Sequence, residues 1–262
     1  MAGRPLAPNP AGAHFLRDRA LIARLARASG AGDGRLVLDL GAGQGAITAG
    51  LAATGARVIA VERDQRLAAR LRRRFDGDPR VRVVEADLRL VPLPRREFLV
   101  VASPPFSLTT ALCRRLLGDP AVRLAGAELV IGWGAARWLA SPRPRDAETA
   151  WWTARYQVRL AQTISAASFV PPPGTDAARL SIRPREIVTS RSGQRLLRSL
   201  LRAAYRSPGA RADTVLANTV LANTVPAGRR RLLIRARVNP GAPVAEVTGE
   251  QWHRLAIMLL SS

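Results

Sequence analysis

Three glycines and two acidic residues, all before residue 90, have types and spacing that could do chemistry together. Gly41, Gly43 and Gly45 follow a short apolar run and allow close approaches that a Cβ atom would prevent. A second apolar run ends in Glu62, whose carboxylate suits the two hydroxyls of a ribose. A third ends just before Asp87, where a carboxylate could accept a hydrogen bond from an adenine amine. We therefore expect these residues to bind a nucleoside-containing cofactor.

The spacing of the glycines separates two classes of cofactor. A dinucleotide fingerprint reads G-x-G-x-x-G, whereas this chain has Gly-Ala-Gly-Gln-Gly shortly after Asp39. That spacing resembles motif I of S-adenosylmethionine methyltransferases, so we favour a methyltransferase over a dehydrogenase. Two structural alternatives stay open. The glycines could form a turn without a ligand, which would leave Glu62 without a purpose, and Asp87 could simply cap a loop.

A further group of residues, Ser103-Pro104-Pro105-Phe106, follows a fourth apolar run beside the expected cofactor cleft. The tetrapeptide resembles the signature of methyltransferases that act on exocyclic amines of bases. Such an amine is a poor nucleophile because its lone pair is delocalised into the ring. Acceptors such as Ser103 Oγ and the Pro104 carbonyl could pull it towards a tetrahedral geometry, and an extruded base could stack on Phe106. The plain alternative is a proline turn at a strand end.

The elements that must position these residues alternate between strand and helix as far as residue 164. This order predicts an α/β fold with a mainly parallel sheet, in which the carboxyl ends of the strands share one edge. The expected strands are 36–40, 58–62, 81–85, 98–102, 127–131, 155–164 and 177–182, and the main helices are 17–29, 64–75 and 107–117.

The pattern changes near residue 183, after which the chain is mostly helical and rich in arginine. We expect a flexible arm over residues 1–11, a catalytic domain over 12–183 and a small, basic, RNA-binding helical domain over 184–262. A direct repeat within residues 214–225 is interpreted as a local duplication, and nothing in the sequence assigns it a function. The tryptophan pair Trp151-Trp152 lies among arginines and could stack on nucleic acid, although core packing is the commoner use of tryptophan.

The composition indicates a polyanionic partner. The net charge is +22, the isoelectric point is near 11.9, and every basic residue is arginine. We favour nucleic acid over a merely basic surface, and a membrane surface is the weaker alternative. There is one cysteine, Cys113, and no metal-ligand spacing, signal core or membrane-spanning run, so we expect a cytoplasmic protein without a metal ion or disulfide.

Taken together, these features resemble the rRNA adenine N6-methyltransferase family, and most closely its Erm branch, which confers macrolide resistance. The likeness extends over residues 9–183. It rests on the run 14–16, the glycine motif, both acidic residues, the tetrapeptide 103–106, the tryptophan-rich region 132–152 and the proline-containing segment 169–176.

The resemblance implies a Rossmann-like domain that uses S-adenosylmethionine, with a small helical C-terminal domain. It also implies a monomer that methylates one adenine of 23S rRNA near the peptide exit tunnel. Carried over by position, Ser103, Pro104 and Phe106 become the catalytic residues, and Phe106 stacks on the target base. The cofactor contacts become His14, Leu16, Gly41, Glu62, Asp87 and Ser103.

Three positions depart from the pattern of the family. Ala13 stands where glutamine is usual, Ser103 where asparagine is usual, and Pro104 where an aliphatic residue is usual. Because serine is shorter than asparagine, its acceptor lies further from the target amine. We therefore expect the transfer of one or two methyl groups, and the hypothesis that serine suggests is slower methylation that stops at one.

Three other functions are compatible with parts of this pattern. The sister branch of the family dimethylates small-subunit rRNA, and the tryptophan-rich region favours the Erm branch over it. A DNA amino-methyltransferase would satisfy the tetrapeptide alone, but the chain has no target-recognition domain. A non-catalytic rRNA-binding factor could retain the same fold.

Overall fold

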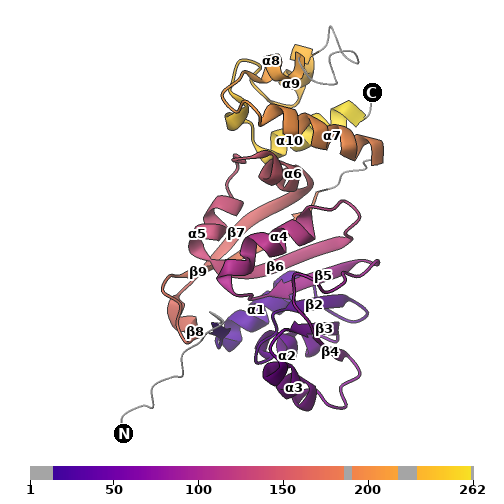
Figure 1. Ribbon diagram of the computed structural model, residues 1–262, viewed down its shortest axis with the longest axis vertical. Helices are drawn as coiled ribbons and strands as arrows, with labels where there is room; N and C mark the ends of the chain where they lie inside the picture. The colour runs from indigo at the N-terminus through magenta and orange to yellow at the C-terminus, as the bar shows by residue number, and fades with distance from the viewer. Residues whose placement is uncertain (1–13, 186–190, 218–228, 261–262) are drawn as a thin grey trace. The chain divides into compact units, whose positions relative to one another are not determined.

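The structure is a computed structural model that describes residues 14–185, 191–217 and 229–260 (Figure 1). The described residues form two compact units. One holds the residues up to Trp138 together with Arg159–Arg183, and the other holds Leu139–Val158 and the residues from Pro184 onward. The predicted flexible arm, residues 1–11, lies outside the described residues.

The first unit is built on a seven-stranded sheet with the order β4-β3-β2-β5-β6-β9-β7. Pairing is parallel from β4 to β6, and β9 runs antiparallel to β6. This confirms the predicted α/β fold with a mainly parallel sheet. The strands are β2 Leu36–Leu40, β3 Arg57–Glu62, β4 Val81–Glu85, β5 Phe98–Ala102, β6 Leu124–Gly132, β7 Tyr156–Ile164 and β9 Ala177–Pro184.

A second, two-stranded sheet anchors the start of the described chain. β1 (Phe15–Leu16) pairs antiparallel with β8 (Phe169–Val170), with Leu16 opposite Phe169. The backbone N–H of Arg17 also donates to the carbonyl of Ser168 at 2.9 Å. The segment around residue 14 is therefore fixed by residues more than 150 positions further along the chain.

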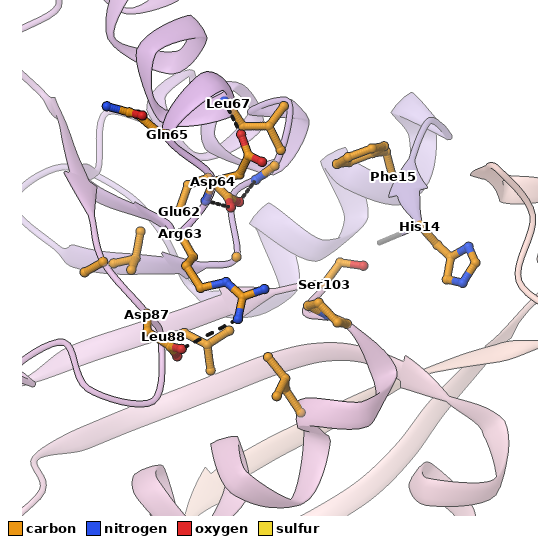
Figure 2. A pocket seen from close by; sticks show the side chains of 16 residues that line it. His14, Phe15, Glu62, Arg63, Asp64, Gln65, Leu67, Asp87, Leu88 and Ser103 are labelled. Carbon is orange, nitrogen blue, oxygen red and sulfur yellow. Dashed lines mark hydrogen bonds and ion pairs between the residues drawn. The ribbon is translucent and has the colours of Figure 1, made fainter. Parts of the chain in front are cut away.

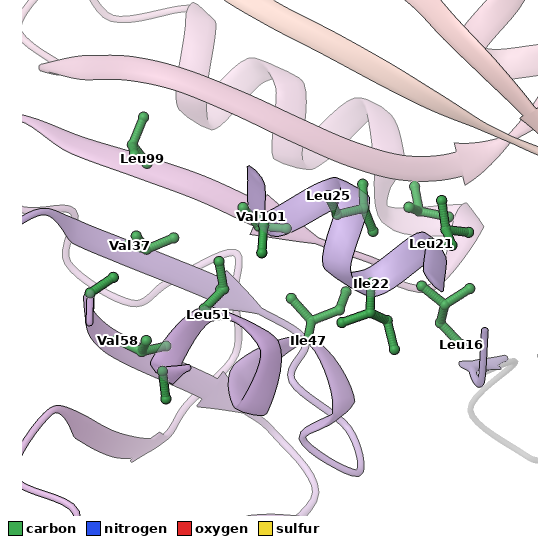
Figure 3. Close-up of a cluster of buried hydrophobic side chains, with 14 of the residues drawn as sticks. Leu16, Leu21, Ile22, Leu25, Val37, Ile47, Leu51, Val58, Leu99 and Val101 are labelled. Atoms are coloured by element: carbon green, nitrogen blue, oxygen red, sulfur yellow. The ribbon is translucent and has the colours of Figure 1, made fainter. Parts of the chain in front are cut away.

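The core of this unit follows from uninterrupted apolar strands. Every residue of β2 and β5 is buried, so helices and loops cover both faces at the centre of the sheet. On one face, α1 (Arg19–Ser29) and α2 (Ala46–Ala52) pack on the strands (Figure 3). The cluster includes Leu21, Ile22 and Leu25 of α1, together with Val37, Ile47, Leu51, Val58, Leu99 and Val101.

Short polar caps set where two of these helices begin. Asp18 accepts a hydrogen bond from the N–H of Leu21 at the start of α1. Asp64 does the same for Leu67 at the start of α3 (Gln65–Arg74). The arginines of α3 are exposed to solvent. The next two α-helices along the chain are α4 (Thr109–Leu117) and α5 (Trp133–Leu139).

The second unit is helical. It contains α6 (Ala147–Arg155), α7 (Arg191–Ala204), α8 (Ala212–Ala217), α9 (Arg229–Arg235) and α10 (Gly249–Leu260). α6 packs on α7 and α10, which is why residues 139–158 group with the C-terminal residues although the sequence places them before residue 183. Trp151 and Trp152 are buried in α6, so these two side chains pack in the interior and offer no ring face to nucleic acid.

Two further sequence features are placed only in part. Residues 214–217 of the first copy of the direct repeat end α8, with Val215 and Leu216 buried, and the rest of the repeat lies outside the described residues. Among the described residues, no helix is long and apolar enough to cross a membrane.

Candidate functional site

A cavity of about 510 Å³ lies where β2, β3, β4 and β5 end at their carboxyl edge (Figure 2). Parallel strands bring side chains that are far apart in the sequence together at this edge. Five of the residues that the resemblance assigned to the site line this cavity: His14, Gly41, Glu62, Asp87 and Ser103.

The glycine loop after β2 supports one wall of the cavity. Gly41 and Gly43 have φ angles of +87° and +55°, in the left-handed region that side chains disfavour. A Cβ atom on Gly43 would lie 2.9 Å from the ring of Phe15. The loop therefore requires glycine at this position, both for its backbone conformation and for the close approach of the aromatic ring.

The carboxylate of Glu62 is held in place by backbone donors. Its Oε2 accepts from the N–H of Gly43 and its Oε1 accepts from the N–H of Asp64, each at 2.8 Å. Each oxygen has a second lone pair that these bonds leave free. A ribose could donate its two hydroxyls to this prearranged carboxylate.

Asp87 carries a strongly stabilised negative charge at the end of β4. Its oxygens accept from the backbone and guanidinium of Arg89, and Arg63 lies 3.9 Å from Oδ2. These bonds from Arg89 lower the pKa of Asp87 from 3.8 to about 2. In Figure 2 the side chain of Arg63 extends towards Asp87. The carboxylate is thus ionised at neutral pH, but Arg89 already donates hydrogen bonds to both of its oxygens.

Asp39 lies fully buried behind the glycine loop. Thr48 Oγ1 donates to its Oδ2 at 2.6 Å, whereas Oδ1 has no hydrogen-bond partner. Burial raises the pKa of Asp39 from 3.8 to about 7. In the sequence, Asp39 served only to locate the glycine motif. In the structure, its pKa is among the most strongly shifted of the groups near the site.

The tetrapeptide after β5 is divided between the cavity and the core. Ser103 and Pro105 line the cavity, and Ser103 Oγ is buried without a hydrogen-bond partner. Pro104 is buried, and its Cα would lie 3.6 Å from a Cβ on Gly41. The hydroxyl of Ser103 therefore has an unused acceptor position at the end of the strand.

Phe106 and Leu16 do not line this cavity. The ring of Phe106 meets that of Phe169 edge-on, with centroids 6.2 Å apart, and lies 5.9 Å from that of His14. Leu16 is buried in the core cluster, so a cofactor contact at this residue would use its backbone. His14 is oriented by a 2.8 Å hydrogen bond between Nδ1 and the carbonyl of Pro171.

The residues present fit S-adenosylmethionine on grounds of their own chemistry. Glu62 and Asp87 provide anionic acceptors for ribose hydroxyls and an adenine amine, and Ser103, whose Oγ has no hydrogen-bond partner among the described residues, also lines the cavity. Leu88 and Leu108 offer apolar surface for a base.

Several lining residues were absent from the sequence-based set. Phe15 lies within the run 14–16, Arg63 follows Glu62 and Leu88 follows Asp87. The sequence could have indicated these residues only through their position next to a residue that was expected to bind the cofactor. Leu108 was placed at a helix start without a role. Nothing in the sequence indicated that Arg89 would donate hydrogen bonds to the carboxylate of Asp87.

A model of the ribosomal RNA adenine dimethylase family matches residues 9–260 of this chain. The chain belongs to that family. It is accordingly an S-adenosylmethionine-dependent rRNA adenine N6-methyltransferase with a Rossmann-like fold, as its sequence predicted. Membership also argues against the dehydrogenase and DNA methyltransferase alternatives.

Relatives in the dimethylase family come from both of its branches. The mycinamicin-resistance protein MyrB of Micromonospora griseorubida is 33% identical over 93% of this chain and 76% of its own. The ribosomal RNA small subunit methyltransferase A of Synechococcus sp. (strain JA-2-3B'a(2-13)) is 30% identical over 95% of this chain and 91% of its own. The crystal structure of the 23S rRNA methyltransferase ErmE matches with a TM-score of 0.78 and 27% identity, over 95% of this chain and all of that one.

Proposed function

We propose that this enzyme methylates N6 of one adenine in 23S rRNA near the peptide exit tunnel and so gives resistance to macrolide-type antibiotics. The observation that supports this most is the cavity, in which Glu62, Asp87 and Ser103 meet at one edge of the sheet. The likeness to ErmE over nearly the whole chain and to MyrB favours the large subunit as the source of the substrate.

In this proposal, residues at the strand ends bind the cofactor. Glu62 accepts from the ribose hydroxyls, Asp87 accepts from the adenine amine, and Gly41 and His14 line the remaining space. The loop of Gly43 keeps Glu62 oriented through its backbone N–H. When bound, S-adenosylmethionine supplies an electrophilic methyl group on its sulfonium.

The residues after β5 prepare the target amine. Ser103 Oγ and the carbonyl of Pro104 accept hydrogen bonds from the amine, which favours a localised lone pair on nitrogen. Ser103 Oγ has no competing partner among the described residues, so it is free to do this. The barrier falls mainly through positioning, since attack on a sulfonium needs no strong base. We also propose that the target base stacks on the exposed part of Phe106.

A substrate comparison tests the assignment. Purified enzyme is incubated with methyl-labelled S-adenosylmethionine and either a 23S domain V transcript or 30S particles. We expect label in the 23S transcript and background label in the particles. Label confined to 30S particles would overturn the assignment.

The small subunit is the second candidate substrate. One specific observation favours it, namely the 30% identity to the small subunit methyltransferase A of Synechococcus over 95% of this chain. The same assay distinguishes the two, because 30S particles are the substrate in the other arm.

A further inference from the structure

The exposed face of α7 carries a row of arginines without acidic neighbours in sequence. Arg195, Arg198 and Arg202 are all exposed, and Arg206 follows in the turn after the helix. With 3.6 residues per turn, spacings of three and four place these side chains on one face. The opposite face holds Leu197, Leu200, Leu201 and Ala204, which are buried in the second unit.

This row differs from an ordinary solvated helix face. Exposed helices usually mix charges of both signs, as α10 does with its Arg254–Glu250 pair. By contrast, the sequence contains no aspartate or glutamate between residues 187 and 212. No ion pair between described residues involves any of the four arginines, so their charges are uncompensated within the described part of the chain.

One arginine of the row is also held in position. The guanidinium carbon of Arg198 lies 5.7 Å from the centre of the Trp151 ring, and Trp151 is buried in α6. A cation over an indole face is attracted by the ring and loses mobility. The row therefore has a fixed point near its middle, which lowers the entropic cost of binding a ligand.

We propose that this α7 row is an RNA-binding surface that contacts consecutive phosphates of one rRNA strand. From Arg195 to Arg202 the helix rises ~10 Å at 1.5 Å per residue. A nucleic-acid strand presents one phosphate per ~3.4 Å of duplex axis, so the row spans about three phosphates. Contacts of this kind fix the register and orientation of the RNA and carry no sequence information. The inference rests on rRNA being the substrate, as proposed above.

The test compares two triple variants that remove the same charge. One is Arg195→Gln/Arg198→Gln/Arg202→Gln on α7. The matched control is Arg66→Gln/Arg70→Gln/Arg73→Gln on α3, which removes the same number of exposed arginines from a helix of the first unit. Glutamine keeps helix propensity in both. The double variant Arg195→Gln/Arg202→Gln leaves Arg198 on Trp151, in case the triple variant folds poorly.

Binding is measured by filter retention of a 23S domain V transcript and of an unrelated structured RNA of equal length, across a range of salt. For the α7 triple variant, the negative slope of log K against log salt should become less steep by about two to three on both RNAs. For the double variant it should become less steep by about two. The α3 variant should change the slope by less than one. Equal losses in the α7 and α3 variants, or no loss in the α7 variants, would overturn the proposal.

Steady-state kinetics and the binding experiment together separate this inference from the proposed function. Since α7 lies outside the cofactor cavity, the α7 variants should keep the kcat of methyl transfer at saturating RNA while KM rises. The binding experiment needs no methyl transfer, so an enzyme that fails to modify 23S rRNA would still report on the α7 row.

Discussion

Arg89 donates hydrogen bonds to both carboxylate oxygens of Asp87, from Nε to Oδ1 at 3.0 Å and from Nη2 to Oδ2 at 2.6 Å. Asp87 is also the side chain that we assign to the adenine amine of the cofactor. Oδ1 also accepts from the backbone N–H of Arg89 at 2.8 Å, so both lone pairs of that oxygen are already in use. Arg89 and the cofactor therefore compete for one carboxylate.

This competition predicts opposite effects of two substitutions on cofactor affinity. Asp87→Ala removes the acceptor and should raise the Kd for S-adenosylmethionine roughly tenfold, whereas Arg89→Ala should lower it roughly threefold. Isothermal titration calorimetry measures both. Arg80→Ala is the matched control, since Arg80 pairs with Asp78 in the same way but away from the cavity. A higher Kd for Arg89→Ala would contradict the competition.

Ser103 predicts the number of methyl groups transferred. Its Oγ has no partner, but serine reaches less far than the asparagine usual in the family. We expect the wild-type enzyme to give mainly N6-monomethyladenosine and Ser103→Asn to increase the dimethylated product severalfold. Mass spectrometry of the digested RNA measures the ratio. Complete dimethylation by the wild-type enzyme at stoichiometric amounts would refute the idea.

Much of this site could be predicted because local sequence determines it. The strands β2 and β5 are uninterrupted apolar runs, and Asp64 precedes its helix with the type and spacing of a cap. The acidic residues at strand ends follow from parallel pairing, which brings Glu62 and Asp87 to one edge.

Other features depend on contacts that no local pattern encodes. Phe106 meets Phe169 across 63 positions, and His14 bonds to Pro171 across 157. Likewise, α6 groups with the C-terminal helices because of packing alone. The hydrogen bonds that Arg89 donates to the Asp87 carboxylate depend on side-chain orientation, which a spacing of two residues permits but does not require.

Asp39 predicts an unusual dependence of stability on pH. Its folded-state pKa is about 7, above the ordinary 3.8, so the folded protein binds a proton more tightly than the unfolded chain. The contribution of Asp39 to the free energy of unfolding is fully present below about pH 4 and is lost as the pH rises through about 7. Because one pKa unit corresponds to ~1.4 kcal/mol, the loss is at most ~4 kcal/mol.

The variant Asp39→Asn isolates this contribution. Denaturant unfolding at pH 5 and pH 7.5 should show a decrease in the free energy of unfolding for the wild type that exceeds the decrease for the variant. The difference should be at least ~1 kcal/mol, since partial relaxation reduces the full value. The same pH dependence in both proteins would show that Asp39 does not titrate in this range.

Two glycines predict opposite outcomes of the same substitution. Gly43→Ala places a Cβ atom 2.9 Å from Phe15 at a φ of +55°, so we expect a lower melting temperature and at least tenfold weaker cofactor binding. Gly134 lies in α5 with no atom within 4 Å of a Cβ, so Gly134→Ala should stabilise by ~0.5 kcal/mol. Differential scanning fluorimetry with and without S-adenosylmethionine measures both. Unchanged cofactor binding by Gly43→Ala would contradict the fitted loop.

The central claim is that the residues at this sheet edge direct a methyl group to N6 of an adenine in 23S rRNA. The most direct measurement is mass-spectrometric mapping of a 23S domain V transcript after incubation with wild-type enzyme and with Glu62→Ala, each with S-adenosylmethionine. We predict N6-methylated adenosine at one position with the wild-type enzyme, and at least a hundredfold less with Glu62→Ala at limiting cofactor. An unmodified transcript, or a methyl group on an atom other than N6, would contradict the account.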